Sequence, residues 1–153
     1  MAEPHFEPKP GQIDYTNAKQ VPVVHCVVRH ENRILLVQRS AEMKLYPSAW
    51  SGISGFLDDR HGIENKAREE LQEEANITGD DIVSITEGEM FEEDDPTYGK
   101  TWIVHPVRVE VKTDRVTLNW EGQNYKWVTI EEIENIGIVP GFMRVLENLA
   151  LAE

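Results

Sequence analysis

Residues 55–77, with the sequence GFLDDRHGIENKAREELQEEANI, constrain the fold of this chain more than any other stretch. A glycine turn leads into a segment whose apolar residues have helical spacing. If residues 63–75 form a helix, its apolar stripe consists of Ile63, Ala67, Leu71 and Ala75. Such a stripe has to be buried against another element, so a helix packed on the core is predicted here.

The same segment carries acidic side chains on a neighbouring face. Glu70, Glu73 and Glu74 are spaced i, i+3 and i+4, and therefore lie within one helical turn of each other. Like charges four residues apart destabilise a helix by about 0.2–0.5 kcal/mol per pair, and the helix dipole disfavours anions in the last turn. A divalent cation that prefers hard oxygen ligands would turn this repulsion into coordination. The alternative is a solvated acidic surface with Lys66 and Arg68 as partial partners.

The stretch resembles the Nudix box, whose pattern is G-x5-E-x7-R-E-U-x-E-E-x-G-U, where U is an aliphatic residue. Gly55 matches the first glycine. The later part, E-U-x-E-E-x-x-U, is matched by Glu70, Leu71, Glu73, Glu74 and Ile77. Outside this stretch the chain resembles the family only in its order of elements.

Departures from the pattern occur at His61 for the first glutamate, Glu69 for the arginine and Asn76 for the second glycine. Asparagine is the next-best residue after glycine for a left-handed helix C-cap, so the change at Asn76 is mild. In the family the first glutamate and the arginine are an acid and a base that help to hold the loop against the helix. Because both charges are exchanged here, we hypothesise a swapped contact between His61 and Glu69. Two independent surface losses are the alternative.

The resemblance implies an enzyme that splits the diphosphate bridge of a nucleoside diphosphate linked to another group. Attack on this negatively charged bridge needs Mg²⁺ or Mn²⁺, which neutralises it and lowers the pKa of a bound water. The matching positions imply metal ligands at the Gly55 carbonyl and at Glu70, Glu73 and Glu74. Glu121 precedes an aromatic strand, as an acid does late in the family's chains. Either Glu70 or Glu121 would then take the proton from the attacking water.

Candidates for substrate contacts lie outside the box. The loop of residues 40–51 places Tyr46 and Met43 just before it, where they could meet a base or another leaving group. Trp50 resembles a tryptophan that commonly packs beneath the box in the family, so we expect a structural role for it. His105 lies beside a proline in a long alternating strand, where it either lines the site or caps a face of the sheet.

The rest of the pattern predicts a strand-rich chain. Strands are expected at residues 21–28, 33–38, 53–57, 82–91, 101–111, 116–120 and 125–128. A mobile acidic loop is expected at 92–96, and Pro106 suggests a sheet edge or a bulge.

Two helical segments are expected near the end of the chain. Thr129 and Glu132 have the spacing of a capping box. A last amphipathic helix is expected to bury Phe142, Val145, Leu146 and Leu149. The pattern alone gives a mixed sheet of the α+β or α/β class, and the resemblance implies a Nudix-like α/β/α sandwich.

Composition limits the number of domains and the class of protein that this chain can form. A chain of 153 residues, 40% hydrophobic and 28% charged, fits one globular domain at 21–153 after an extended arm at 1–20. No apolar run approaches the ~20 residues that span a bilayer. The net charge of −13 repels duplex nucleic acid and anionic membranes. No signal peptide is evident and the single cysteine, Cys26, excludes an internal disulfide framework, so a cytoplasmic protein is expected. We expect His25 to be a satisfied core or edge histidine.

Two other functions stay open at this point. The altered box is compatible with a Nudix-like module that senses a nucleotide without cleaving it. Isomerases of isoprenoid diphosphates share the fold but need a suitably placed cysteine, and Cys26 lies well before the box. The sequence names neither the substrate nor the oligomeric state, although many relatives pair as homodimers through the sheet or the arm.

Overall fold

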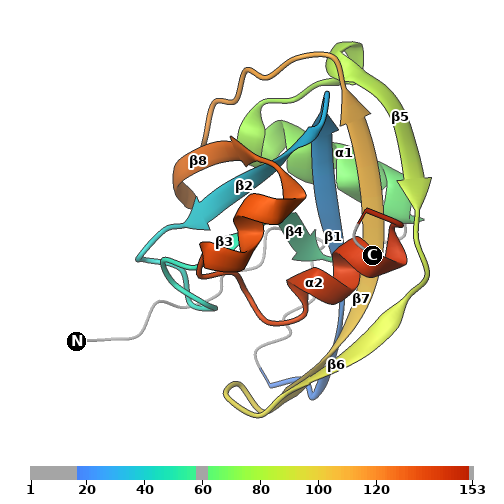
Figure 1. Cartoon of the computed structure of the whole chain (residues 1–153). Coiled ribbons are helices and arrows are strands. Elements are labelled where there is room, and N and C mark those ends of the chain that lie inside the picture. Colours follow the sequence, from blue (N-terminus) through green and yellow to red (C-terminus); the bar gives the residue numbers. More distant parts are fainter. Residues whose placement is uncertain (1–16, 58–61, 152–153) are drawn as a thin grey trace.

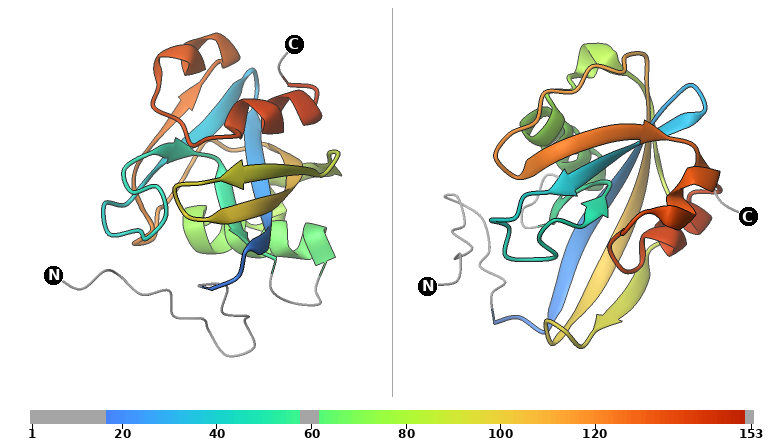
Figure 2. Two further views of the ribbon diagram at one scale, coloured as in Figure 1. Left: turned by 90° about the horizontal axis from the view of Figure 1, so that it is seen from below. Right: turned by 60° about the vertical axis from the view of Figure 1, so that its left-hand side comes forward.

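The structure is a computed structural model that describes residues 17–57 and 62–151. A mixed sheet runs through the middle, with helix α1 on one face and helix α2 on the other (Figures 1 and 2). The predicted fold class, an α/β (α+β) sandwich around a mixed sheet, is confirmed. The elements in chain order are β1 (Gln20–His30), β2 (Arg33–Arg39), β3 (Trp50–Ser51), β4 (Ile53–Phe56), α1 (Gly62–Ala75), η1 (Gly79–Asp81), β5 (Ile82–Glu87), β6 (Phe91–Asp95), β7 (Lys100–Val111), β8 (Gly122–Val128), η2 (Ile130–Asn135) and α2 (Phe142–Asn148).

The centre of the sheet is a parallel pair. Residues 20–29 of β1 lie beside 101–110 of β7, and the other strand pairings in the described part of the chain are antiparallel. The strand order is β3-β2-β1-β7-β5, while β4, β6 and β8 pair with β1, β7 and β2. Val21 and Val27 pack in the core under α2, and Val24 packs in the core under α1. β1 is therefore apolar on both faces, as a buried parallel strand requires.

Two apolar cores lie on opposite faces of the sheet. The helices α1 and α2 cover these two faces (Figure 2, left). On one face the predicted stripe of the box helix is buried at Ala67, Leu71 and Ala75, with Ile63 half-buried at its start. On the other face α2 and the residue after it bury the predicted set Phe142, Val145, Leu146 and Leu149. The alanines let α1 lie close to the strands, so its acidic face is brought against the sheet.

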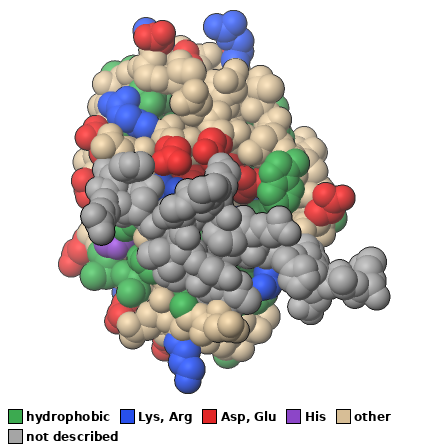
Figure 3. All heavy atoms as spheres, turned by 180° about the vertical axis from the view of Figure 1, so that it is seen from behind, with side chains coloured by type: hydrophobic (Ala, Val, Ile, Leu, Met, Phe, Trp, Pro, Cys, Tyr) green, Lys and Arg blue, Asp and Glu red, His purple; other side chains and the backbone are tan. Residues whose placement is uncertain are grey.

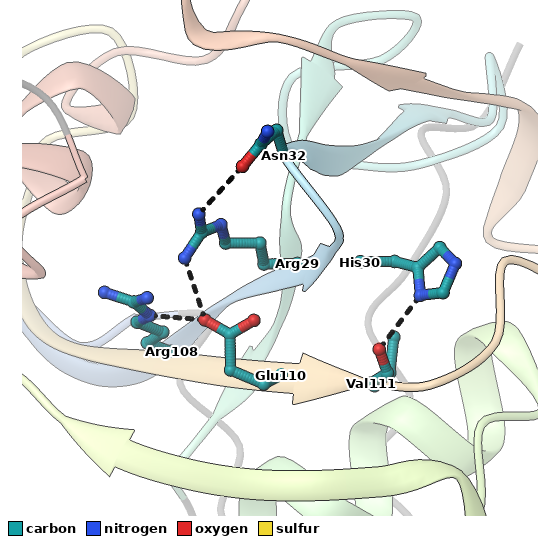
Figure 4. A network of polar contacts seen from close by, with 6 residues as sticks. All are labelled: Arg29, His30, Asn32, Arg108, Glu110 and Val111. Carbon is teal, nitrogen blue, oxygen red and sulfur yellow. Dashed lines mark hydrogen bonds and ion pairs between the residues drawn. The ribbon is translucent and has the colours of Figure 1, made fainter.

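A polar network fixes the register at one end of the central pair (Figure 4). Arg29 Nη1 and Arg108 Nε both contact Glu110 Oε1, at 3.3 and 2.7 Å. His30 Nδ1 lies 3.0 Å from the carbonyl oxygen of Val111. One carboxylate thus ties β1 to β7 where the parallel ladder ends.

The acidic stretch after residue 90 differs from the prediction. The strand expected at 82–91 is interrupted, and residues 92–96, expected to be a mobile loop, mostly belong to β6, which pairs with β7. Phe91 is buried and anchors the strand in the core under α2. Trp102 Nε1 donates a hydrogen bond of 2.8 Å to Asp95 Oδ2, and Thr101 Oγ1 donates one of 2.8 Å to Asp94. These donors on β7 hold acidic side chains that sequence reasoning assigned to solvent.

Pro106 lies in the middle of the sheet and not at its edge, because β7 runs between β1 and the β5 and β6 strands. On the second side β5 ends opposite Val107 and β6 begins opposite Val104. The Pro106 carbonyl accepts a hydrogen bond from Gly88 N, at 2.9 Å, inside this gap. The proline therefore occupies a position where one ladder is already interrupted.

The predicted strand at 116–120 is wrong, since residues 113–119 form no strand. The Thr117 N–H donates instead to the carbonyl of Ala75, at 3.0 Å, and so satisfies the end of α1. Asn76 has φ 56°, which confirms its predicted left-handed C-cap conformation. Its N–H donates to the Gln72 carbonyl at 3.1 Å.

The capping box predicted at Thr129 and Glu132 is confirmed. The Thr129 N–H donates to Glu132 Oε1 at 3.1 Å, at the start of the short helix η2. Just before β1, the Lys19 carbonyl accepts a hydrogen bond of 2.7 Å from Thr101 N. Residues 1–16 of the arm lie outside the described residues. No helix in the described ranges has the length and apolarity to cross a membrane.

Candidate metal and substrate site

Gly55 on β4 and Glu70 on α1 are in direct contact. A Cβ atom added to Gly55 would lie 2.4 Å from Glu70 Cδ and 2.5 Å from its Oε1. Any other residue type at position 55 would force the Glu70 carboxyl group to move. Glycine therefore lets the side chain of the helix lie directly on the backbone of the strand.

Glu70 does not belong to a solvated surface. Its exposed fraction is 7%, and that of Lys66 is 1%. Lys66 Nζ lies 3.2 Å from Glu70 Oε1. Arg68, the other proposed partner, turns away and pairs with exposed Glu64 at 3.6 Å. The part of the acidic face of α1 that contains Glu70 is thus buried inside the protein.

Glu74 lies beside Glu70 and shares a hydrogen bond with it. Burial, and then the charge of Glu70, raise the pKa of Glu74 well above its ordinary value. Burial also raises the pKa of Glu70, although the hydrogen bond from Glu74 and the Lys66 ammonium act in the opposite direction. Glu74 Oε2 is buried and has no hydrogen-bond partner among the described residues. Without a cation, the fold therefore favours the protonated form of Glu74.

Glu121 reaches the same place from another part of the chain. Pairing of β2 with β8 sets Arg39 opposite Gly122, so the preceding residue lies beside the end of β2. The Glu121 N–H donates to Asn119 Oδ1 at 3.0 Å, and its carbonyl accepts from Ser40 N at 2.7 Å. The charge of Glu121 contributes to the raised pKa of Glu74. The structure therefore brings together Glu74 and Glu121, which sequence reasoning assigned to one site.

Arg39 is a half-buried cation beside these carboxylates that sequence reasoning missed. Burial lowers its pKa, and the charges of Glu74 and Glu121 oppose this effect. Its Nε donates to the Leu45 carbonyl at 2.7 Å, so it also anchors the loop that follows β2. The only sequence signal was its position at the end of a buried strand. Lys66 was likewise considered only as a surface partner of the acidic face.

The proposed substrate-contacting loop lies at this end of the sheet. Tyr46 has φ 47°, and its N–H donates to Tyr98 Oη at 2.8 Å. The two rings meet edge to face with centroids 4.9 Å apart. The Met43 N–H donates to the Ser40 carbonyl at 3.0 Å. Tyr46 and Met43 are both half-buried, so each keeps part of its side chain accessible.

His105 and Trp50 lie on opposite faces of the sheet. Val24 of β1 pairs with both Gly55 and His105, so these three residues form one row on the face that α1 covers. Trp50 packs instead on the core under α2, with Lys126 Nζ 4.4 Å from the centroid of its ring system. The expectation that Trp50 packs beneath the box is therefore wrong.

Two buried residues of β1 border the site without an accessible reactive group. His25 Nε2 accepts a hydrogen bond from Gly52 N at 3.3 Å, so its prediction as a satisfied core histidine is confirmed. Burial, with the charge of Arg39, lowers its pKa to about 4. Cys26 is fully buried, and burial together with Glu74 and Glu70 raises its pKa. A thiol in this state is a poor proton donor or acceptor for the isomerase alternative.

The donor set suits a hard divalent ion. The carboxylates at Glu70, Glu73 and Glu74, among them the orphaned Glu74 Oε2, and the backbone carbonyl of Gly55 all offer oxygen. Acidic side chains gather near the middle of the face that α1 covers (Figure 3). Within the described ranges, no three His, Cys, Asp or Glu side chains already converge as a metal-binding group. An ion would have to replace the Glu70–Glu74 hydrogen bond. His61 and its swapped contact with Glu69 lie outside the described residues.

Comparisons with known proteins agree with this fold and identify the family. The NUDIX domain family model matches residues 19–149. An Ap4A hydrolase from C. elegans, solved as a binary complex, is 24% identical with TM-score 0.68, covering 85% of this chain and 95% of that one. The NUDIX domain of Shewanella oneidensis NrtR, complexed with ADP ribose, is 15% identical with TM-score 0.69, covering 86% of each chain. A MutT NUDIX hydrolase from Burkholderia pseudomallei is 15% identical with TM-score 0.70, covering 85% and 98%. No curated protein sequence matches significantly.

Proposed function

The chain belongs to the Nudix hydrolase family, and from this premise we propose that it cleaves the diphosphate linkage of a nucleoside diphosphate joined to another group. The observation that carries the proposal is buried Glu70 against Gly55, with half-buried Glu74 and its buried Oε2 atom beside it. A structural helix has no reason to place two carboxyl groups side by side at its contact with a sheet. A site that binds a cation and a polyphosphate does.

The Gly55 carbonyl and the carboxylates of Glu70, Glu73 and Glu74 would hold Mg²⁺ or Mn²⁺. When bound, the ion neutralises the diphosphate and lowers the pKa of a coordinated water. We assign the proton acceptor to Glu121 in preference to Glu70. Lys66 already holds one oxygen of Glu70, whereas Glu121 Oε1 accepts only a long hydrogen bond of 3.4 Å from Asn119 Nδ2. Glu121 is thus freer to turn toward a water.

Tyr46 and Met43 are our candidates for contacts to the leaving group. His105 is our candidate for a further substrate contact, from the row that it forms with Val24 and Gly55. One solved Nudix protein of similar fold was crystallised with ADP ribose, and another is an Ap4A hydrolase. We therefore include dinucleoside polyphosphates and ADP-ribose among the candidate substrates. The charge of −13 disfavours duplex nucleic acid and anionic membranes as partners. A cytoplasmic location and a homodimer complete the proposal.

The test is a hydrolysis screen of nucleoside di- and triphosphate derivatives with Mg²⁺ or Mn²⁺, reading phosphate after phosphatase coupling. We expect metal-dependent turnover that Glu74→Gln and Glu121→Gln both abolish. Glu64→Gln is the matched control, because Glu64 is an exposed acid on the same helix. Full activity of a variant that lacks both Glu73 and Glu74 would remove the metal assignment.

A second candidate is a nucleotide sensor that binds without cleaving. It is favoured by Glu69 in place of the box arginine and by the absence, among described side chains, of a ready-made metal group. Calorimetric titration with ADP-ribose and Ap4A decides between the two. Tight binding with no product after prolonged incubation with Mn²⁺ supports the sensor.

A further inference from the structure

Lys66 is the largest side chain among those almost completely buried in the described part of the chain. Lysine is almost never fully buried unless its ammonium is paired. The apolar stripe of α1 does not need it, because Ala67, Leu71 and Ala75 already fill the contact with the sheet. Packing of α1 therefore does not explain the buried ammonium group of Lys66, and the explanation has to come from the site.

The ammonium of Lys66 is paired with Glu70, at 3.2 Å from Oε1. The residues are i and i+4 with the lysine first, which is the weaker order for supporting a helix. Arg68 and Glu64 on the same helix have the favourable order, with the acid first, and are exposed. Helix stability thus accounts for the surface pair and not for the buried one.

The sequence also indicates that the positive charge of Lys66 could substitute for a charge missing from the box. The box pattern has an arginine at position 69, and this chain has Glu69, so an acidic face has gained an anion where it would carry a cation. Arg68 faces away from the site toward Glu64. Lys66 lies one helical turn before position 69, on the side of α1 that faces Glu70.

We infer that Lys66 is a positioning residue that replaces the missing positive charge of the box and holds Glu70 in place. This inference rests on the proposed function. Glu70 is held on two sides: Lys66 takes Oε1, and the carboxyl group is pressed against Gly55, where a Cβ would overlap it. The pair keeps a ligand oriented before the ion arrives. Lys66 itself touches neither the water nor the substrate in this scheme.

The experiment compares Lys66→Met with Arg68→Met. Methionine keeps most of the length and apolar bulk of the side chain and removes the charge, while Arg68 is the matched cation on the exposed side of α1. Crystal structures of both metal-free variants show where Glu70 lies. Steady-state kinetics with Mn²⁺ give kcat and KM, and electron paramagnetic resonance of free Mn²⁺ gives the ion affinity of the wild-type protein.

In metal-free Lys66→Met we expect the Glu70 carboxyl group to leave Gly55 and kcat to fall about 10–100-fold, the usual effect of losing an outer-shell partner, with little change in KM. Arg68→Met should keep both the position of Glu70 and kcat. If Lys66→Met does not fold, Lys66→Gln undergoes the same measurements, since it keeps a hydrogen-bond donor without charge.

Two failures are distinguishable. If the wild-type protein binds no Mn²⁺ and cleaves nothing, the proposed function fails and this inference fails with it. If the wild type binds Mn²⁺ and cleaves substrate, but the uncharged variant keeps Glu70 against Gly55 and keeps its kcat, only the role of Lys66 is overturned. Reduced stability alone, with Glu70 and kcat unchanged, also overturns it, because Lys66 then only supports the fold.

Discussion

Folding raises the pKa of the Glu74 carboxyl group and so favours its protonated form. Its pKa is raised by burial first and by the charge of Glu70 second. Above the ordinary value of 4.5 the unfolded chain releases this proton while the folded chain keeps it, so folding loses stability as the pH rises. The group most needed for a cation is therefore a cost to the metal-free fold.

Glu74→Gln should be more stable than the wild type at pH 8 in the presence of EDTA, by about 0.5–2 kcal/mol, the usual gain from relieving a functional site. At pH 4, where both states carry a proton at Glu74, the difference should shrink. Urea unfolding of both proteins at the two pH values measures it. An equal difference at both values would show that the charge of Glu74 is not the cause.

Among single residues, the acidic side chains of the site could be predicted from the sequence, but the cations beside them could not. Glu70, Glu73 and Glu74 follow from helical spacing and from the box. Arg39 lies far from them in sequence, and its place depends on the pairing of β2 with β8. Lys66 was visible at i−4 from Glu70, but only the packing of α1 shows that its ammonium is buried.

The end of α1 depends on the left-handed conformation of Asn76, with φ 56°. Asn76→Gly should be neutral to within a few tenths of a kcal/mol, because glycine adopts this conformation without strain. Asn76→Ala should lower the free energy of unfolding by about 1–2 kcal/mol, because Cβ crowds the following carbonyl. Thermal and urea unfolding of the two variants provide the comparison. If alanine is as stable as glycine, the cap does not limit the helix.

The junction of β1 with β3 and β4 should respond to acid through His25. Its pKa is about 4 in the fold and 6.5 as a free group. Between these two pH values the imidazole is protonated in the unfolded chain and mostly neutral in the folded chain. Stability from this histidine is complete above pH 6.5 and is lost progressively down to about pH 4, a total of about 3 kcal/mol.

His25→Gln is the test, because glutamine can still accept the hydrogen bond from Gly52 N but does not titrate. We expect the variant to lose less stability than the wild type between pH 7 and pH 4 in urea unfolding. Parallel pH profiles of the two proteins would assign the acid response to other groups.

Elements were predicted well where local patterns decide them and poorly where distant partners do. The box helix and the last helix follow from their apolar stripes. β6 does not, because its acidic sequence is held by donors on β7. Residues 116–120 have the alternation of a strand, but the N–H of Thr117 is used by the end of α1.

For the whole molecule, binding of an ion at the acidic site should stabilise the fold by mass action. Mn²⁺ at a hundredfold excess over its Kd should add about 2.7 kcal/mol to the free energy of unfolding. Thermal unfolding at increasing Mn²⁺ concentration measures this, and EDTA should reverse it. Glu64→Gln should show the full effect and Glu74→Gln a much smaller one. Equal stabilisation of both variants would place the ion elsewhere.

The parallel pairing of residues 20–29 with 101–110 has a consequence for biosynthesis. While a ribosome makes this protein, β1 emerges early and remains without its central neighbour until β7 has been translated. Joining segments so distant along the polypeptide is slow, and apolar surface on both sides of β1 is exposed in the meantime. The nascent chain therefore carries an unpaired, aggregation-prone strand until translation has passed β7.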